Sequence, residues 1–225
     1  MATTDARQRG RLPGAESGQR TCPADTRHAI LQAARERFLH YGFKKTTVDE
    51  IAADAGVGKG SVYLHFDGKD EILLSIVLEV KRNITAQMRT IAASLASPDD
   101  KLRRMVSAWI LSVHDAYTAA AHGSEVVDDL RPQLSSRPHY RDMFQEEMAA
   151  QRAAFAVALE EGNRKGDFDI ADPDRTAHLF MTAFRAYFPP YLCAAYPQER
   201  TREQLEDDAQ EMTTFLMRAL ERRRH

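Results

Sequence analysis

The sequence predicts an all-α fold. Apolar residues recur at three- and four-residue spacing along most of the 225 residues. No segment alternates polar and apolar residues as a half-buried strand would. Capping residues, glycines and prolines separate the periodic stretches, as they do between helices. Three parts are expected: an arm over 1–22, a small helical domain over 23–68 and a helical bundle over 69–225.

The N-terminal elements follow from these signals. Residues 1–22 are rich in Gly, Arg, Ser and Thr without periodicity, which is typical of a disordered arm. A first helix is expected from about Asp25 to Tyr41, with Gly42 as its stop.

The stretch Thr46–Phe66 predicts two short helices joined by a tight turn. Thr47 and Glu50 have the spacing of a capping box, in which each side chain satisfies a backbone N–H of the other. Gly56 is placed to end this helix in the left-handed conformation. The second helix, about Lys59 to Leu64, is too short to be stable in isolation.

The second short helix has the composition of a helix that enters a DNA groove. Lys59, Gly60 and Ser61 are charged or small, so a backbone can approach an anionic surface closely. Tyr63 and His65 are placed to contact phosphates. A phosphate loop is excluded because Lys59 is followed by glycine rather than serine or threonine. An ordinary helical hairpin without a DNA role stays open as the alternative.

The remaining residues predict a bundle of longer helices. The Ser-Pro-Asp-Asp run at 97–100 has a cap, a first-turn proline and acids that suit the start of a helix. The other expected segments are Lys69 to about Ser94, a short segment from Ser124 to Leu134, Pro138 to Glu161 with Gly162 as its stop, Asp172 to the Pro189-Pro190 pair, and Thr201 to Leu220.

Residues 27–73 resemble the DNA-binding domain of TetR-family transcriptional regulators. The matching motifs are Phe38–Gly42–Phe43, Thr46–Thr47, Ile51–Ala52, Ala55–Gly56–Val57, Tyr63–Leu64–His65–Phe66 and Lys69. Gly58 and Gly68 depart from the pattern, since the family usually has a hydroxyl or amide side chain there. The DNA-binding residues predicted from the motifs and the helix chemistry are Thr46, Thr47, Lys59, Gly60, Ser61, Tyr63, His65 and Lys69.

A homodimer is the expected assembly. A six-residue helix makes few contacts, and a two-fold dimer doubles them over two half-sites. The last two helices carry apolar stripes, and the resemblance implies that they pair with a second subunit. The expected DNA partner is a palindromic double-stranded operator.

The middle helices are rich in aromatic residues and methionine, which suits an apolar small-molecule site. Plain core packing explains the same residues. The candidates for binding an apolar or aromatic effector are Trp109, Val113, Tyr117, Phe144, Met148, Phe180, Phe184 and Tyr187. Arg104, His114, His178 and Arg185 are candidates to orient a polar ligand head. The resemblance implies an inducer that changes the spacing of the two DNA-reading helices.

Charge, hydropathy and cysteine content indicate which partners and locations suit this chain. Residues 1–66 hold 10 Lys and Arg against 7 Asp and Glu, which suits a DNA-docking end. No apolar run is long enough for a membrane span, and the polar start predicts a cytoplasmic protein. The two cysteines, Cys22 and Cys193, suit reduced thiols, and a redox role for Cys193 stays open. Neither a metal site nor a cofactor is expected.

The combined prediction is a ligand-responsive transcriptional repressor that a small molecule releases from its operator. A repressor or architectural protein that needs no effector is the alternative. An enzyme is disfavoured because the acid pairs lie where helix starts or solvated faces place acids, and no serine nucleophile elbow occurs.

Overall fold

The computed structural model describes residues 23–118, 130, 132–187 and 201–220. Every regular element among them is helical, which confirms the all-α class. The elements are α1 (Pro23–Tyr41), α2 (Val48–Asp54), α3 (Lys59–Tyr63), α4 (Lys69–Ala92), α5 (Pro98–Thr118), α7 (Pro138–Lys165), α8 (Pro173–Ala183), the 3-10 helix η1 (Phe184–Tyr187) and α10 (Arg202–Leu220).

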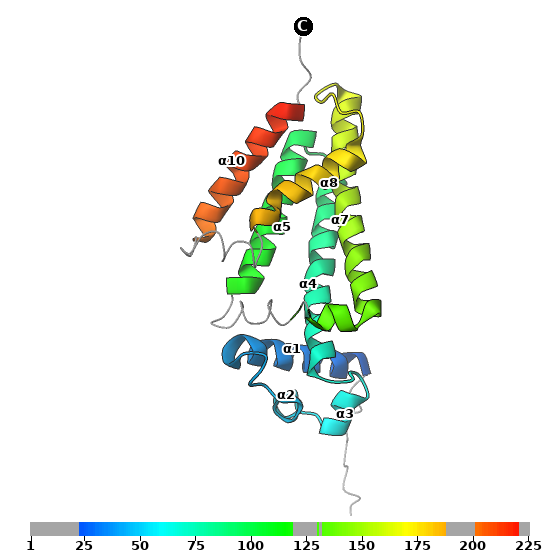
Figure 1. The fold of residues 1–225 in the computed structure, drawn as a ribbon, viewed down its shortest axis with the longest axis vertical. Coiled ribbons are helices and arrows are strands. Elements are labelled where there is room, and N and C mark those ends of the chain that lie inside the picture. Colours follow the sequence, from blue (N-terminus) through cyan, green and yellow to red (C-terminus); the bar gives the residue numbers. More distant parts are fainter. Residues whose placement is uncertain (1–22, 119–129, 131, 188–200, 221–225) are drawn as a thin grey trace, which may run out of the picture.

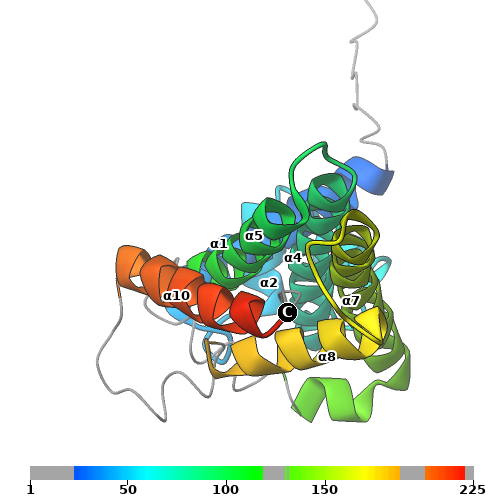
Figure 2. The same ribbon diagram turned by 90° about the horizontal axis from the view of Figure 1, so that it is seen from above.

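The helices form two parts joined by α4. The short helices α2 and α3 lie with α1 at one end of the molecule, and α4 leads from there into a longer body (Figure 1). In the body α4 packs along α7 and also against α5, while α8 packs against α7. On the other side of α5 lies α10, as the view from above also shows (Figure 2). The DNA-binding candidates therefore lie at one end of the molecule, and the ligand candidates lie in the body.

Each part has its own apolar core, and α4 contributes to both. Ile72 and Leu73, at the start of α4, are buried with residues of α1, α2 and α3. Ile84 and Met88, further along α4, are buried with residues of α5, α7, α8 and α10. One continuous helix thus contributes to both cores, so the boundary predicted at residue 69 falls at the start of a helix that the two parts share.

Three predicted helix starts are confirmed by their caps. Ser97 Oγ accepts from the Asp100 N–H at 3.2 Å, and Asp172 Oδ1 accepts from the Arg175 N–H at 2.9 Å. Thr201 caps α10 with the reciprocal bonds of a capping box, at 3.2 Å and 3.0 Å with Gln204.

The predicted end of α7 at Gly162 is wrong. The helix continues to Lys165 and ends at Gly166, which has the left-handed φ of 80° that a C-terminal cap needs. Gly162 serves a different purpose, because a Cβ on it would lie 2.0 Å from Cδ2 of Phe168. The glycine allows the buried Phe168 ring to pack directly on the helix backbone.

The helix that begins after Asp172 also differs from the prediction. It is α-helical only to Ala183 and tightens into the 3-10 helix η1 from Phe184. The Pro189-Pro190 pair, the arm over 1–22, both cysteines and most of the short segment expected from Ser124 lie outside the described residues.

Within the described ranges, no helix is long and apolar enough to cross a membrane. The same residues contain no group of three or more His, Cys, Asp or Glu side chains arranged to hold a metal ion.

Candidate nucleic-acid interface

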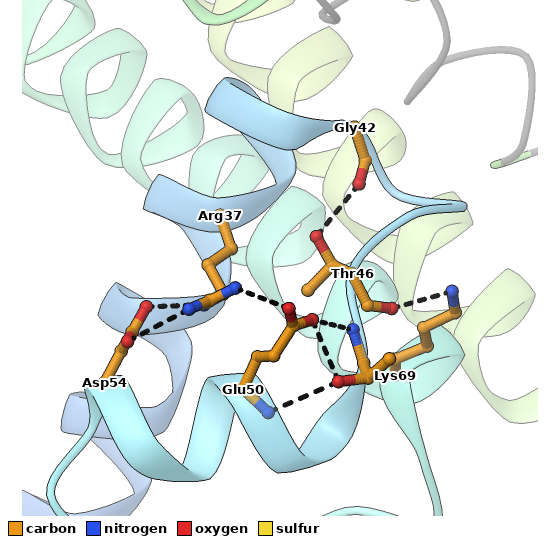
Figure 3. Close-up of polar contacts among 7 residues, drawn as sticks. Arg37, Gly42, Thr46, Glu50, Asp54 and Lys69 are labelled. Carbon is orange, nitrogen blue, oxygen red and sulfur yellow. Dashed lines mark hydrogen bonds and ion pairs between the residues drawn. The ribbon is translucent and has the colours of Figure 1, made fainter.

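The turn between α1 and α2 is built from hydrogen bonds to its own backbone. Gly42 has a φ of 87°, and its N–H donates to the Phe38 carbonyl at 3.1 Å, which ends α1. Thr46 Oγ1 donates to the Gly42 carbonyl at 2.9 Å, and Thr46 is 1% exposed. Lys69, from the start of α4, donates through Nζ to the carbonyls of Phe43 and Thr46 at 2.8 Å and 3.0 Å. Figure 3 shows the Thr46 side chain directed to Gly42 and the Lys69 side chain directed to the Thr46 carbonyl.

The predicted capping box of α2 is present. Thr47 Oγ1 accepts from the Glu50 N–H at 3.3 Å, and Glu50 Oε2 accepts from the Thr47 N–H at 2.8 Å. The hydrogen bonds that the Thr47 N–H and hydroxyl donate to the Glu50 carboxylate lower the pKa of Glu50, and the neighbouring Arg37 lowers it further. Arg37 of α1 also forms a bidentate pair with Asp54, at the end of α2 (Figure 3). Because Arg37 contacts both ends of α2, it fixes that helix against α1.

The turn between α2 and α3 closes as a Schellman motif. The Val57 N–H donates to the Ala52 carbonyl at 3.0 Å, and the Gly56 N–H donates to the Ala53 carbonyl at 3.1 Å. Gly56 has the required φ of 67°, and Val57 packs against the N-terminal core. The predicted glycine stop is confirmed. The turn sets the direction in which α3 leaves α2.

Helix α3 is anchored on one side and exposed on the other. Val62 is 0% exposed and Phe66 is 2% exposed, so both hold α3 to the core. Tyr63 is 50% exposed and Leu64, just beyond the helix, is 85% exposed. The described part of the chain therefore leaves this side of α3 uncovered.

The N-terminal end of α3 is open and carries one cation. A Cβ on Gly58 or Gly60 would meet nothing within 4 Å, so these glycines leave the backbone accessible. Lys59 Nζ lies 2.8 Å from Asp49 Oδ1, and both side chains are more than half exposed, at 55% and 64%. The hydrogen bond that the Lys59 ammonium donates to Asp49 raises the pKa of Lys59. A cation beside bare backbone N–H groups is an arrangement that accepts phosphate or base-edge acceptors.

Two of the predicted DNA-binding residues make structural contacts within the free domain. Thr46 is buried, and its hydroxyl donates a hydrogen bond to the Gly42 carbonyl. Its side chain is therefore not accessible at the surface of the free protein. The Nζ of Lys69 is surrounded by three carbonyls, those of Phe43, Lys44 and Thr46, and lies 4.6 Å from the centre of the Phe43 ring. A phosphate would have to replace these bonds. In the free protein the Lys69 ammonium therefore stabilises the α1–α2 turn, and its contact with a phosphate stays a prediction.

The other candidates remain predictions with different surroundings. The Thr47 side chain is engaged in the cap of α2, although the residue is exposed. Lys59, Gly60 and Tyr63 are exposed, while Ser61 and His65 are partly buried. Of the exposed candidates, Lys59, Gly60 and Tyr63 thus lie together on α3, and Thr47 lies at the start of α2.

Sequence reasoning missed the part that Arg37 plays. It lies 17 residues before Asp54, so no local spacing signals the pair. Leu64 was also overlooked, although an apolar residue between Tyr63 and His65 breaks the polar character of that surface and was a usable signal.

The predicted ligand-binding residues lie in the core of the body. Trp109 is 5% exposed, Phe180 is 3% exposed and Phe184 is 0% exposed. Phe144 is buried, and Val113, Met148 and Tyr187 are partly buried. The Tyr117 side chain lies outside what the structure describes.

A row of aromatic rings links several of these residues. Ring centres lie 6.3 Å apart between Trp109 and Phe155, 5.9 Å between Phe155 and Phe180, 5.5 Å between Phe180 and Phe184, and 5.8 Å between Phe184 and Tyr187. The candidates are therefore brought together from α5, α7, α8 and η1. They contact one another, so a ligand among them has to separate the rings.

Comparison with known families matches both parts of the chain. The model for bacterial regulatory proteins of the tetR family matches residues 30–76, which span α2 and α3 and parts of α1 and α4. The model for the C-terminal domain of AefR-like transcriptional repressors matches residues 132–221. The chain belongs to the TetR family of transcriptional regulators. It is accordingly a DNA-binding regulator of transcription, a class of protein distinct from enzymes.

Individual relatives agree with this assignment. The HTH-type transcriptional repressor KstR2 of Mycolicibacterium smegmatis is 27% identical over 146 residues, which cover 65% of this chain and 69% of that protein. The repressor BepR of Brucella suis is 48% identical over 54 residues, which cover 24% of this chain and 26% of that protein. A TetR/AcrR-family regulator from Thermobifida fusca has the same fold, with a TM-score of 0.65 at 21% identity over 88% of this chain and all of that structure.

Proposed function

We propose that this regulator is a repressor that binds a palindromic operator as a homodimer and leaves it when a small molecule binds the body. The observation that carries the proposal is the surface of α3. Lys59 lies there beside two glycines with open Cβ positions, at the end of the molecule and held in place by α1 and α2. Because DNA is the partner, we propose the cytoplasm as its location.

In this proposal the N-terminal end of α3 enters the major groove. The first residues of the second helix meet base edges in helix-turn-helix docking, and flanking groups bind phosphates. Lys59, Gly60 and Ser61 are the groove residues, and Tyr63 and His65 lie next to the DNA backbone. Lys69 and Thr46 support the turn from behind.

The dimer is proposed to form through α8 and α10. Each carries a large apolar side chain that lies on the surface of the single chain: Leu179 is 54% exposed and Phe215 is 70% exposed. Covering them on a second copy would remove apolar surface from water. Light scattering tests this directly, because a mass near the 25.4 kDa of one chain at micromolar concentration overturns the dimer.

The effector is proposed to act by shifting a population. A ligand that prefers a spacing of the two α3 helices unsuited to DNA weakens operator binding by its differential affinity for the two states. The observation that favours the alternative, a repressor without an effector, is the mutual packing of Phe180 and Phe184 within the core. A ligand must separate these rings, whereas an effector-independent repressor keeps them closed.

Selection of bound fragments from genomic DNA tests the main proposal. We expect an inverted repeat whose half-sites are separated by a helical turn or a multiple of it. Binding to a single asymmetric half-site with full affinity would contradict a dimeric reader. Thermal shift against a broad compound panel then separates the two alternatives, because no stabilising compound is expected for an effector-independent repressor.

A further inference from the structure

Lys81 in the body forms no ion pair with the part of the chain that the structure describes. Lys81 lies in the middle of α4 and is partly buried. Its Nζ donates to Met148 Sδ at 3.7 Å and lies 5.4 Å from the centre of the Phe144 ring. A thioether is a weak acceptor, and an aromatic ring carries no formal charge.

The surrounding charges leave this cation poorly compensated. Burial lowers the pKa of the Lys81 ammonium, Glu147 opposes that effect, and the like charge of Arg185 in η1 adds to it. Glu147 is paired with a different cation, since its Oε1 lies 3.7 Å from Arg82 Nε. Arg185 is exposed and forms no ion pair within the described part of the chain. Among the described residues, Lys81 and Arg185 thus act on each other as like charges, and the one acid that acts on Lys81 is shared with Arg82.

A second polar group in the same layer is also incomplete. The Gln151 side chain of α7 is 0% exposed, and its Nε2 donates to Thr85 Oγ1 at 3.2 Å and to the Lys81 carbonyl at 3.4 Å. Its Oε1 has no hydrogen-bond partner among the described residues. Buried polar atoms without partners are uncommon in native structures and call for an explanation, such as a bound polar group.

We propose that Lys81 and Arg185 bind the carboxylate of an amphipathic organic acid, whose apolar part lies against Phe144 and Met148. This inference rests on the proposed function, because it names the chemical class of the effector. A carboxylate forms a charge-assisted hydrogen bond with the ammonium and offsets the repulsion between the two cations. A neutral ligand of the same shape leaves the ammonium unpaired, and a cationic one adds a third positive charge.

The site also joins the two functional parts of the molecule. Lys81 lies on the helix whose first turns are buried with α1, α2 and α3. An anion that draws α4 toward α7 or η1 therefore acts on the element that carries the DNA-binding end. The acid is expected to change operator affinity as well as stability.

The test uses the full chain and ligands with matched apolar parts and different heads. Octanoate, octanol and octyltrimethylammonium form one set, and hydrocinnamate and hydrocinnamyl alcohol form a second. We expect the two acids to raise the melting temperature and the alcohols and the ammonium compound to leave it unchanged. Lys81→Met, which keeps the length and removes the charge, should weaken acid binding by about tenfold or more. Arg89→Met, which removes an exposed charge from the same helix, should bind the acids like the wild type.

The possible results distinguish a failure of the proposed acid-binding site from a failure of the proposed function. Equal responses to acids and alcohols, no response to any acid, or unchanged acid binding in Lys81→Met overturns the site. If Lys81→Met does not fold, Arg185→Met replaces it, since Arg185 is exposed, and unchanged acid binding in that variant has the same meaning. Acid binding that depends on Lys81 but leaves operator affinity unchanged supports the site and contradicts the effector mechanism.

Discussion

Lys59, the first residue of α3, is joined to Asp49 of α2 by a contact of 2.8 Å between Nζ and Oδ1. The contact keeps the cation of the DNA-reading helix next to an acid while the protein is free. DNA binding must therefore either replace Asp49 with a phosphate or base acceptor or include Asp49 in the interface. In the first case the carboxylate competes with DNA, and its removal helps binding.

Replacing Asp49 by Asn should tighten operator binding, and replacing Lys59 by Met should weaken it by about tenfold or more. Fluorescence anisotropy with a mapped operator over a series of salt concentrations measures both effects. If Lys59 contacts a phosphate, the Lys59→Met salt slope falls by about one unit. If Lys59 contacts a base, affinity falls with little change of slope.

Both substitutions lie on an exposed pair, so neither should change the melting temperature measurably. Unaltered operator affinity in Lys59→Met would contradict the proposal that α3 enters the DNA groove. Weaker binding in Asp49→Asn would show that the acid itself takes part in the interface.

Replacing Lys69, unlike replacing Lys59 or Asp49, should change the stability of the protein. Because its Nζ donates to three carbonyls of the α1–α2 turn, Lys69→Met should destabilise the protein by about 2 kcal/mol. Urea unfolding measures the loss. Lys45→Met is the matched control, since Lys45 is an exposed residue of the same turn, and we expect it to unfold like the wild type. If Lys69→Met is as stable as the wild type and the salt slope of its operator binding is lower by about one unit, Lys69 contacts a phosphate.

The contrast between Lys59 and Lys69 shows what a sequence can predict here. The caps at Thr47 and Thr201 were predictable because each depends on a partner three residues away. The structural role of Lys69 was not predictable, because the carbonyls that accept from it lie 23 to 26 residues earlier in the chain. The sequence alone does not distinguish a lysine that binds a phosphate from one that stabilises the neighbouring turn.

Two further differences have the same origin. The sequence predicts a helix stop at Gly162, but glycine serves both as a cap and as a site of close packing, and only the position of Phe168 distinguishes the two. Lys81 shares a face of α4 with Ile84 and Met88, so its charge within an apolar stripe was a signal in the sequence. Its lack of an ion pair within the described residues depends on α7 and η1, which only the fold brings near.

Gly162→Ala should lower the free energy of unfolding by about 1–3 kcal/mol, as overpacking in a filled core does. The added Cβ would lie 2.0 Å from Phe168 Cδ2, so the buried ring must move. Gly60→Ala is the control in urea unfolding, because its Cβ would meet nothing within 4 Å. A Gly162→Ala protein as stable as the control would show that the Phe168 ring moves without loss of packing.

Glu161 should make stability depend on pH in the acid range. Lys101 and Lys165 donate to its carboxylate at 2.5 Å and 2.6 Å and lower its pKa from 4.5 to about 2. Because the folded pKa is depressed, the unfolded chain binds the proton first as pH falls. The contribution is complete above pH 4.5 and is lost as pH falls toward about 2.

Glu161→Gln should therefore be less stable than the wild type at neutral pH, and the difference should shrink between pH 4.5 and about 2. Urea midpoints measured across this range give the profile. Glu160→Gln changes the exposed neighbour on the same helix and should follow the wild-type profile. A constant difference between Glu161→Gln and the wild type at every pH would mean that the loss comes from packing. In that case the two lysines do not hold the Glu161 charge in the folded state.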